Sequence, residues 1–286
     1  MSRFVPASVL VAAAALAAAA PAPASVVTSG GVSYVTKTVN VKPHHFVRKV
    51  VACPKHTEVL GGGAGSHGGF QTDVIQQTYP ADLKDKDNTP DDGWGVVVQN
   101  TRDKATGASV TAVCGKTKTL HYVSLKVPLT ASHTDVEHDV ECPTGQFAYS
   151  GGVSASPARA LKLEANSIFS ASNGHDVWYA YYQSSKDLTA TSYAVCSTVE
   201  PTQANVTLDN LSADARHGQN VACPPNTRVY GGGIETNASY PAVKDNSIEP
   251  KPPTHGGNGS FAGFMDVTAT YMPQMTITAI CGPKLS

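Results

Sequence analysis

The chain has 286 residues and a formal net charge of −1, with 15% of its residues charged. Its 21 basic and 22 acidic residues nearly balance and no basic block occurs, so nucleic acid is excluded as an expected partner. The six cysteines are an even number, which in an exported chain predicts disulfide bonds rather than free thiols.

The first 24 residues have the pattern of a secretory signal peptide. Arg3 provides a short positive start, an apolar stretch covers Val9–Ala20, and Ala22-Pro23-Ala24 fits a cleavage site. The apolar stretch is shorter than the about 20 residues that a membrane-spanning helix needs, and no later stretch is longer. We therefore expect residues 1–24 to be removed, and the mature chain, 25–286, to be secreted without a transmembrane segment.

The mature sequence states one pattern three times, which predicts a repeat architecture. Each copy has a Cys-Pro step, a glycine cluster, a bulky aromatic residue and a β-branched run that ends at a second cysteine. The three openings are Val50–Gly63, Asp139–Gly152 and Asn220–Gly233. The repeat selects one disulfide pairing, Cys53–Cys114, Cys142–Cys196 and Cys223–Cys281. A structural zinc site is disfavoured, because no closely spaced cysteine pair is present.

Strand patterns dominate the sequence between the cysteine motifs. Alternating apolar and polar residues at 32–41, 120–127 and 205–211 predict half-buried strands that open each copy. No capped amphipathic helix occurs, and Pro157–Ala165 is expected to form a turn or a single helical turn. The repeating unit is about 85 residues long, which gives β repeats at 25–116, 117–198 and 199–286 within one domain.

We expect an all-β fold in which the three disulfide-stapled repeats close around a pseudo-threefold axis into a β-prism-like body. Closure leaves no end copy and protects sheet edges. The alternative is three tandem immunoglobulin-like sandwiches, although Trp94 and Trp178 lie far beyond the first cysteine of their copies, unlike the strand C tryptophan of that fold. Trp94 and Trp178 are expected to be core residues rather than sugar contacts. The alignment places Ile75, Ile168 and Ile248 at one position and makes Phe264 the third aromatic residue.

The repeated pattern of Cys-Pro, glycine cluster, tryptophan and cysteine resembles uncharacterised secreted proteins of actinobacteria, and the alanine-rich leader fits a bacterial source. More distantly, three cysteine-containing β repeats of this size are similar to the C-terminal β-prism domain of apicomplexan perforin-like proteins. This resemblance implies a non-enzymatic module that recognises a membrane. Nothing in the sequence resembles a pore-forming domain.

No motif supports an enzyme. Gly63–Gly68 matches the glycine pattern of dinucleotide-binding loops, and Ala64–Gly68 approaches that of a nucleophile elbow. Both sites need a helix after the loop, whereas the residues that follow Phe70 are strand-like. We therefore expect no catalytic residue and no cofactor, and assign the glycines to the repeated backbone.

The loop Asp82–Asp92 is rich in carboxylates and is the one candidate for calcium, although it lacks the EF-hand spacing. A solvated acidic loop is the alternative that we favour, so no metal site is assigned. His44, His45 and His133 are expected on the surface or in turns.

The expected function is a secreted, non-enzymatic binding module. Recognition is assigned to loops, because rigid β scaffolds usually present ligand contacts there. The expected ligand is a glycan or the cell envelope, then a membrane surface, then an extracellular protein; the alternative is a structural or assembly protein of the cell surface or of a secreted complex. The predicted contact residues are Tyr79, Asp85, Asp87 and Asp91 in the first copy, Asn173, His175 and Asp176 in the second, and His255, Asn258 and Phe261 in the third.

Overall fold

The computed structural model describes residues 24–66, 73–83, 87, 89–131, 136–170, 175–212, 215–237, 242–249, 259–267 and 274–285. These residues form nineteen β-strands and one 3-10 helix of three residues, which confirms the predicted all-β class. The helical turn expected near Pro157 covers only Ala158–Ala160 (η1), and the residues after it form a strand. The predicted signal peptide lies outside the described residues, apart from Ala24.

The strands of the three predicted segments follow one another along the chain. The first segment contains β1 Ser25–Ser29, β2 Val32–Val41, β3 Phe46–Ala52, β4 Glu58–Ser66, β5 Asp73–Ala81, β6 Gly93–Asn100 and β7 Thr106–Gly115. The second contains β8 Leu120–Leu129, β9 Val136–Glu141, β10 Phe147–Ser156, β11 Leu161–Ser170, β12 Asp176–Ser184 and β13 Leu188–Ser197. The third contains β14 Thr202–Leu208, β15 Ala215–Ala222, β16 Thr227–Thr236, β17 Ala242–Glu249, β18 Ser260–Val267 and β19 Met275–Pro283.

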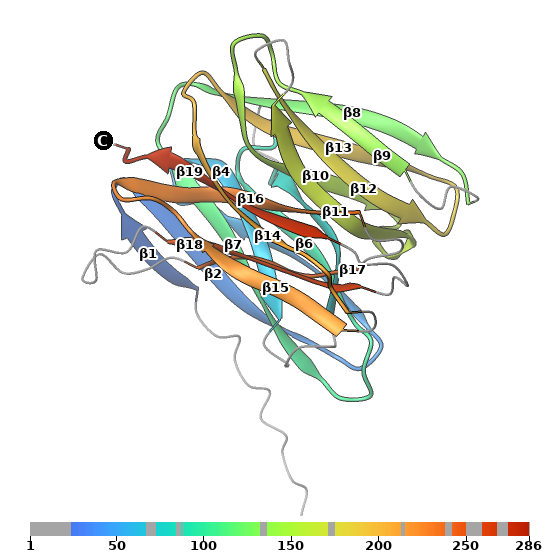
Figure 1. Ribbon diagram of the computed structural model, residues 1–286. Helices are drawn as coiled ribbons and strands as arrows, with labels where there is room; N and C mark the ends of the chain where they lie inside the picture. Colours follow the sequence, from blue (N-terminus) through green and yellow to red (C-terminus); the bar gives the residue numbers. More distant parts are fainter. Residues whose placement is uncertain are drawn as a thin grey trace, which may run out of the picture.

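The strands build three antiparallel sheets, and every sheet combines two segments (Figure 1). Sheet I has the order β1-β2-β7-β4-β17-β18-β15, sheet II has β3-β6-β5-β10-β13-β8, and sheet III has β14-β19-β16-β11-β12-β9. Single residue pairs join the two halves: Ala64 with Asn246, Thr78 with Val153, and Asn166 with Ile234. Three tandem sandwiches would keep the strands of each segment together, so this topology excludes the immunoglobulin-like alternative.

None of the three sheets is closed. The edge strands are β1 and β15 in sheet I, β3 and β8 in sheet II, and β14 and β9 in sheet III. Each sheet therefore keeps two edge strands, and no sheet edge is removed by closure of a sheet on itself. The end of the chain instead meets its beginning, because the backbone N–H of Leu285 donates a hydrogen bond to the carbonyl of Gly30 over 2.8 Å.

The glycine clusters lie where the sheets meet. Strands β4, β10 and β16, which carry these clusters, contact one another pairwise. A β-carbon at Gly61 would overlap the carbonyl of Tyr230, and one at Gly231 would overlap the carbonyl of Tyr149. At the corresponding place in β10 stands Ser150, whose hydroxyl donates to the carbonyl of Leu60 over 2.8 Å. The clusters thus permit a backbone approach that larger side chains would block.

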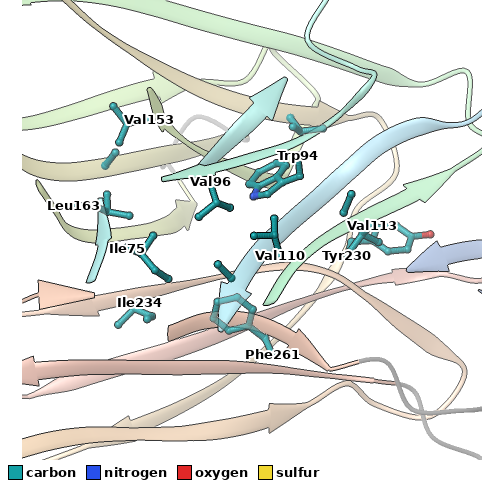
Figure 2. Packing of buried hydrophobic residues seen from close by; sticks show 14 of the residues in the cluster. Ile75, Trp94, Val96, Val110, Val113, Val153, Leu163, Tyr230, Ile234 and Phe261 are labelled. Carbon is teal, nitrogen blue, oxygen red and sulfur yellow. The ribbon is translucent and has the colours of Figure 1, made fainter. Parts of the chain in front are cut away.

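A second glycine of each cluster lies under an aromatic ring. The pairs are Gly62 with Trp94, Gly151 with Trp178, and Gly232 with Phe261, and a side chain at any of these glycines would overlap the ring. All three rings are essentially buried. Figure 2 shows Trp94 and Phe261 in the largest hydrophobic cluster, which draws residues from all three segments.

The strand register corrects the predicted alignment of the third aromatic residue. Trp94 pairs with Pro80, Trp178 with Ile168, and Phe261 with Ile248. Phe261 rather than Phe264 therefore occupies the aromatic position, and Pro80 rather than Ile75 matches the two isoleucines. The hairpin loops before the aromatic residues differ in length, so counting forward from an isoleucine does not keep the register.

The three predicted disulfides are confirmed. They join residues 61, 54 and 58 positions apart, and each holds its two Cα atoms 5.7 Å from one another. In each segment, the backbone N–H of the first cysteine donates a hydrogen bond to a carbonyl at the start of the strand that carries the buried aromatic residue, or one residue before it. The pairs are Cys53 with Asp92, Cys142 with Asp176, and Cys223 with Gly259. Each disulfide therefore fixes the hairpin that carries the buried aromatic residue to the last strand of its segment.

Candidate functional site

A groove on the outer face of sheet II is the best candidate for a binding site, and we call it the Tyr79–Tyr193 groove. Its volume is about 350 Å³. It is lined by residues from β3, β5, β8, β10, β13 and the loop after β5: Arg48, Val50, Tyr79, Pro80, Ala81, Asp82, Pro90, Ser124, Lys126, Ser154, Thr191 and Tyr193. The groove therefore crosses nearly the whole sheet and joins strands of the first and second segments.

The register of sheet II explains why side chains from its different strands face the same groove. Tyr79 pairs with Gly95. Because Thr78 pairs with Val153 in an antiparallel register, Gly152 lies opposite Tyr79, and Gly152 in turn pairs with Tyr193. Tyr193 in turn pairs with Ser124. Paired residues lie on the same face of a sheet, and residues two apart on one strand share a face. The same rule places Ser154, Thr191 and Lys126 beside one another in the next row.

Tyr79 is the rigid base of the groove. Its side chain is 3% exposed, and its ring covers Gly95, where any side chain would overlap it. The guanidinium of Arg48 lies over this ring, 5.3 Å from the centroid. Burial raises the pKa of the Tyr79 phenol, and the positive charge of Arg48 offsets this in part, so the phenol is neutral at physiological pH.

Tyr193 brings a second aromatic ring and a hydroxyl to the same place. Its ring centroid lies 6.3 Å from that of Tyr79, with 26° between the two planes. Its hydroxyl lies 3.2 Å from that of Ser154. Tyr193 is half-buried, whereas Arg48, Ser124 and Lys126 are exposed. The groove thus offers aromatic surface, several hydroxyls and two cationic side chains to a ligand.

A second cavity, of about 660 Å³, lies between the turn before β4, the loop before β6 and the residues that follow β7. Glu58, Asp91 and Asp92 line it together with Lys116 and Lys118. Asp91 was predicted as a ligand contact, but its carbonyl accepts the backbone N–H of Val59 over 2.8 Å, so it also has a structural role. Burial raises the pKa of the Glu58 carboxyl, and the nearby Asp91 raises it further.

We expect Glu58→Gln to stabilise the protein at neutral pH. The pKa of Glu58 in the folded chain is above its usual 4.5, so its ionised form is disfavoured by folding. The wild type therefore gains stability as the pH falls through the folded pKa, and the advantage of the variant disappears below the usual value. Urea unfolding of both proteins from pH 3 to pH 8 measures this; a variant that is less stable at pH 7 would contradict it.

The third cavity contains two predicted contact residues, His175 and Asp176, and has a volume of about 180 Å³. Asp176 is 3% exposed, and its carboxylate accepts hydrogen bonds from the hydroxyl of Ser170 over 2.8 Å and from the backbone N–H of Ala148 over 3.1 Å. The imidazole Nε2 of His175 lies 3.5 Å from the carboxylate of Glu141. Asp176 therefore holds the start of β12 in place, and little of it is accessible to a ligand.

The remaining predicted contacts that the structure describes do not gather at one site. Asp87 is exposed, and its carboxylate accepts the backbone N–H of Thr89 over 2.8 Å. Phe261 is buried in the core, so we withdraw it as a ligand contact. Four predicted contacts lie outside the described residues: Asp85, Asn173, His255 and Asn258. Of the six predicted contacts that the structure describes, Tyr79 alone lies in the Tyr79–Tyr193 groove.

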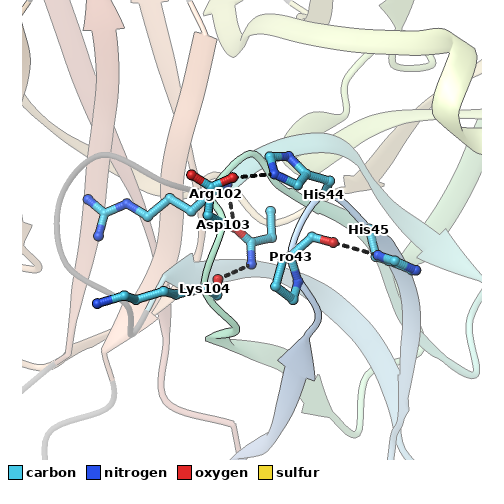
Figure 3. Close-up of polar contacts among 7 residues, drawn as sticks. Pro43, His44, His45, Arg102, Asp103 and Lys104 are labelled. Atoms are coloured by element: carbon cyan, nitrogen blue, oxygen red, sulfur yellow. Dashed lines mark hydrogen bonds and ion pairs between the residues drawn. The ribbon is translucent and has the colours of Figure 1, made fainter.

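Polar side chains of two neighbouring loops, between β2 and β3 and between β6 and β7, contact one another (Figure 3). The imidazole of His44 lies 2.8 Å from the carboxylate of Asp103, and that of His45 lies 2.6 Å from the carbonyl of Pro43. Buried Asn100 fixes the neighbouring hairpin by donating to the carbonyl of Lys104 over 2.8 Å. Both histidines are exposed, as predicted, and His133 lies outside the described residues.

Within the described ranges, no three histidine, cysteine or acidic side chains are placed to hold a metal ion. The loop that was the calcium candidate is described only in part. Over the same residues, no helix has the length and apolar character to cross a membrane.

In comparisons with known proteins, no family model matches the chain, and no curated protein has a significantly similar sequence. The candidate site is therefore assigned on its own geometry.

Sequence reasoning missed most of the groove because it searched the loops. Arg48, Lys126 and Tyr193 belong to strands that are distant in the sequence, and only the pairing of β5 with β10 brings these strands into one sheet. One signal was available in β13, where Thr189, Thr191 and Tyr193 are exposed or half-buried and alternate with the buried residues Ala190, Ser192 and Ala194. That alternation indicates a polar face but does not say which other strands share it.

Proposed function

We propose that this protein is a secreted, non-enzymatic binding module that recognises a glycan of a cell envelope through the Tyr79–Tyr193 groove. The observation that carries the proposal is the half-buried ring of Tyr193, which lies beside the buried ring of Tyr79 in an open groove bordered by the hydroxyls of Ser124, Ser154 and Thr191. Aromatic surface contacts the apolar face of a sugar, and neighbouring hydroxyls exchange hydrogen bonds with its edge. Three disulfides favour an oxidising compartment, in keeping with the proposed secretion.

We further propose that the three segments form a β-prism-like body around a pseudo-threefold axis, with the boundaries 25–116, 117–198 and 199–286. The support is the cyclic exchange of strands, in which each segment shares one sheet with each of the other two. The mutual contacts of β4, β10 and β16 would then lie about the axis. This arrangement accords with the resemblance to the β-prism domains of perforin-like proteins. It supplies a rigid frame for the groove.

The proposal predicts that Tyr193→Ala weakens glycan binding about tenfold, the loss that corresponds to about 1.4 kcal/mol for an aromatic contact at the centre of a site. The full chain and the variant are compared on a glycan array, and the affinity for each bound glycan is then measured by calorimetry. The matched control is Leu125→Ala, an exposed residue of β8 adjacent to Ser124 and therefore on the opposite face.

Liposome flotation and a pull-down from native culture fluid test the other targets in parallel. Flotation with plain phospholipid vesicles, without any glycan binding, would favour a membrane surface. If no glycan is retained by the wild type, or if Leu125→Ala lowers binding as much as Tyr193→Ala, the proposed function is wrong.

The open sheet edges favour a second candidate, a structural or assembly protein. Edge strands such as β9 and β14 present one row of backbone groups that can pair with a strand of another chain. Co-purification with a single partner chain, in the absence of glycan binding, would support this alternative.

A further inference from the structure

We infer that the ligand of the Tyr79–Tyr193 groove is an anionic polysaccharide, that is, a sugar polymer that carries carboxylate or phosphate groups. This inference rests on the proposed function and specifies its substrate class. It comes from the placement of two cationic side chains, Arg48 and Lys126, at opposite ends of the groove.

The guanidinium of Arg48 is preoriented for binding an anion. It rests on the ring of Tyr79, which is itself fixed between Arg48 and Gly95, so the planar group lies over a rigid surface. The attraction between a cation and an aromatic face orients the group without neutralising it. A planar guanidinium binds a carboxylate or phosphate through two parallel hydrogen bonds, and little further ordering is needed here.

The balance of charge also favours an anion. Among the described residues that line the groove, Asp82 is the only acidic one, against Arg48 and Lys126. Within the part of the chain that the structure describes, the ion pairs of lysine, arginine and histidine with carboxylates involve neither of these two cations. Both side chains are exposed, so each can meet a charged ligand.

The spacing of the two cations selects a polymer rather than a small ion. Arg48 is on β3 and Lys126 is on β8, the two edge strands of the six-stranded sheet. Five strand spacings separate their backbones by roughly 24 Å, at about 4.8 Å for each step. Even with both side chains extended toward one another, a single carboxylate or phosphate does not reach both. A chain of sugars with repeated charges does, and its uncharged units lie over Tyr193 and the hydroxyls between the two cations.

The test uses the full chain and three polymers in calorimetric titrations. Polygalacturonate provides carboxylates, a glycerol-phosphate teichoic acid provides phosphates, and carboxyl-reduced polygalacturonate provides the matching neutral chain. We expect binding of one or both anionic polymers, weaker binding as salt is raised, and at least tenfold weaker binding of the neutral chain. Arg48→Gln and Lys126→Gln should each weaken binding of the anionic polymer about tenfold.

Arg102→Gln and Lys104→Gln are the matched controls, since they remove the same charges from an exposed loop away from the groove and should leave binding unchanged. Equal affinity for the neutral and anionic chains, lost in Tyr193→Ala, would overturn this inference and leave the proposed function intact. Equal losses in the groove variants and the loop controls would also overturn it. If neither these polymers nor the arrayed glycans bind, the proposed function fails as well.

Discussion

Trp94→Ala should lower the free energy of unfolding by about 3–5 kcal/mol, the range for truncating a buried aromatic side chain. Trp94 is 1% exposed, and its ring fills the space above Gly62. The substitution also removes the hydrogen bond that the indole Nε1 donates to the hydroxyl of Thr78 over 2.7 Å. Thr78 pairs with Val153 at the junction where β5 meets β10, so the lost hydrogen bond lies next to the contact between two segments.

Two further variants separate the contributions of Trp94. Trp94→Phe keeps most of the ring but leaves the Thr78 hydroxyl without its donor, so a smaller loss of about 1–3 kcal/mol is expected. Tyr193→Ala, in the half-buried wall of the groove, should change stability less than Trp94→Ala. Urea unfolding at pH 7 measures all three. A loss below 1 kcal/mol for Trp94→Ala would show that this ring does not support the core.

Removing the disulfide between Cys142 and Cys196 by alanine substitution of both residues should cost about 4 kcal/mol. The bond closes a loop of 54 positions, and without it the unfolded chain gains conformational freedom. Both cysteines are at most 2% exposed, so alanine avoids burying the hydroxyls that serine would introduce.

The other two disulfides provide the internal comparison. Their loops span 61 and 58 positions, so the entropic model gives nearly the same cost for each bond. Denaturant unfolding of the three double-alanine variants measures these costs. Three similar losses are the expected result. A double variant that unfolds at the same urea concentration as the wild type would contradict the prediction for that bond.

The strands and the disulfide bonds were predictable because neither prediction requires knowing which strands pair with one another. Alternation of apolar and polar residues gives strands without knowledge of their partners, and the repeated spacing of Cys53 and Cys114 with their counterparts gives the disulfides. The core role of Trp94 and Trp178 followed from the same spacing. The third aromatic residue was misassigned because loops of different length change the count between elements, whereas the backbone pairing that places Phe261 is insensitive to loop length.

The candidate site separates what the sequence predicts from what only the folded structure shows. The sequence by itself determined the all-β class and the three disulfide bonds, and it named as a ligand contact one residue, Tyr79, that lines the groove. Only the tertiary structure decided that β5 and β10 pair, and hence that Arg48, Tyr193 and Lys126 face one groove. The physical reason is that strand pairing across segments depends on backbone hydrogen bonds, which any residue can make, and that the glycine clusters permit close approach without specifying which strands meet there.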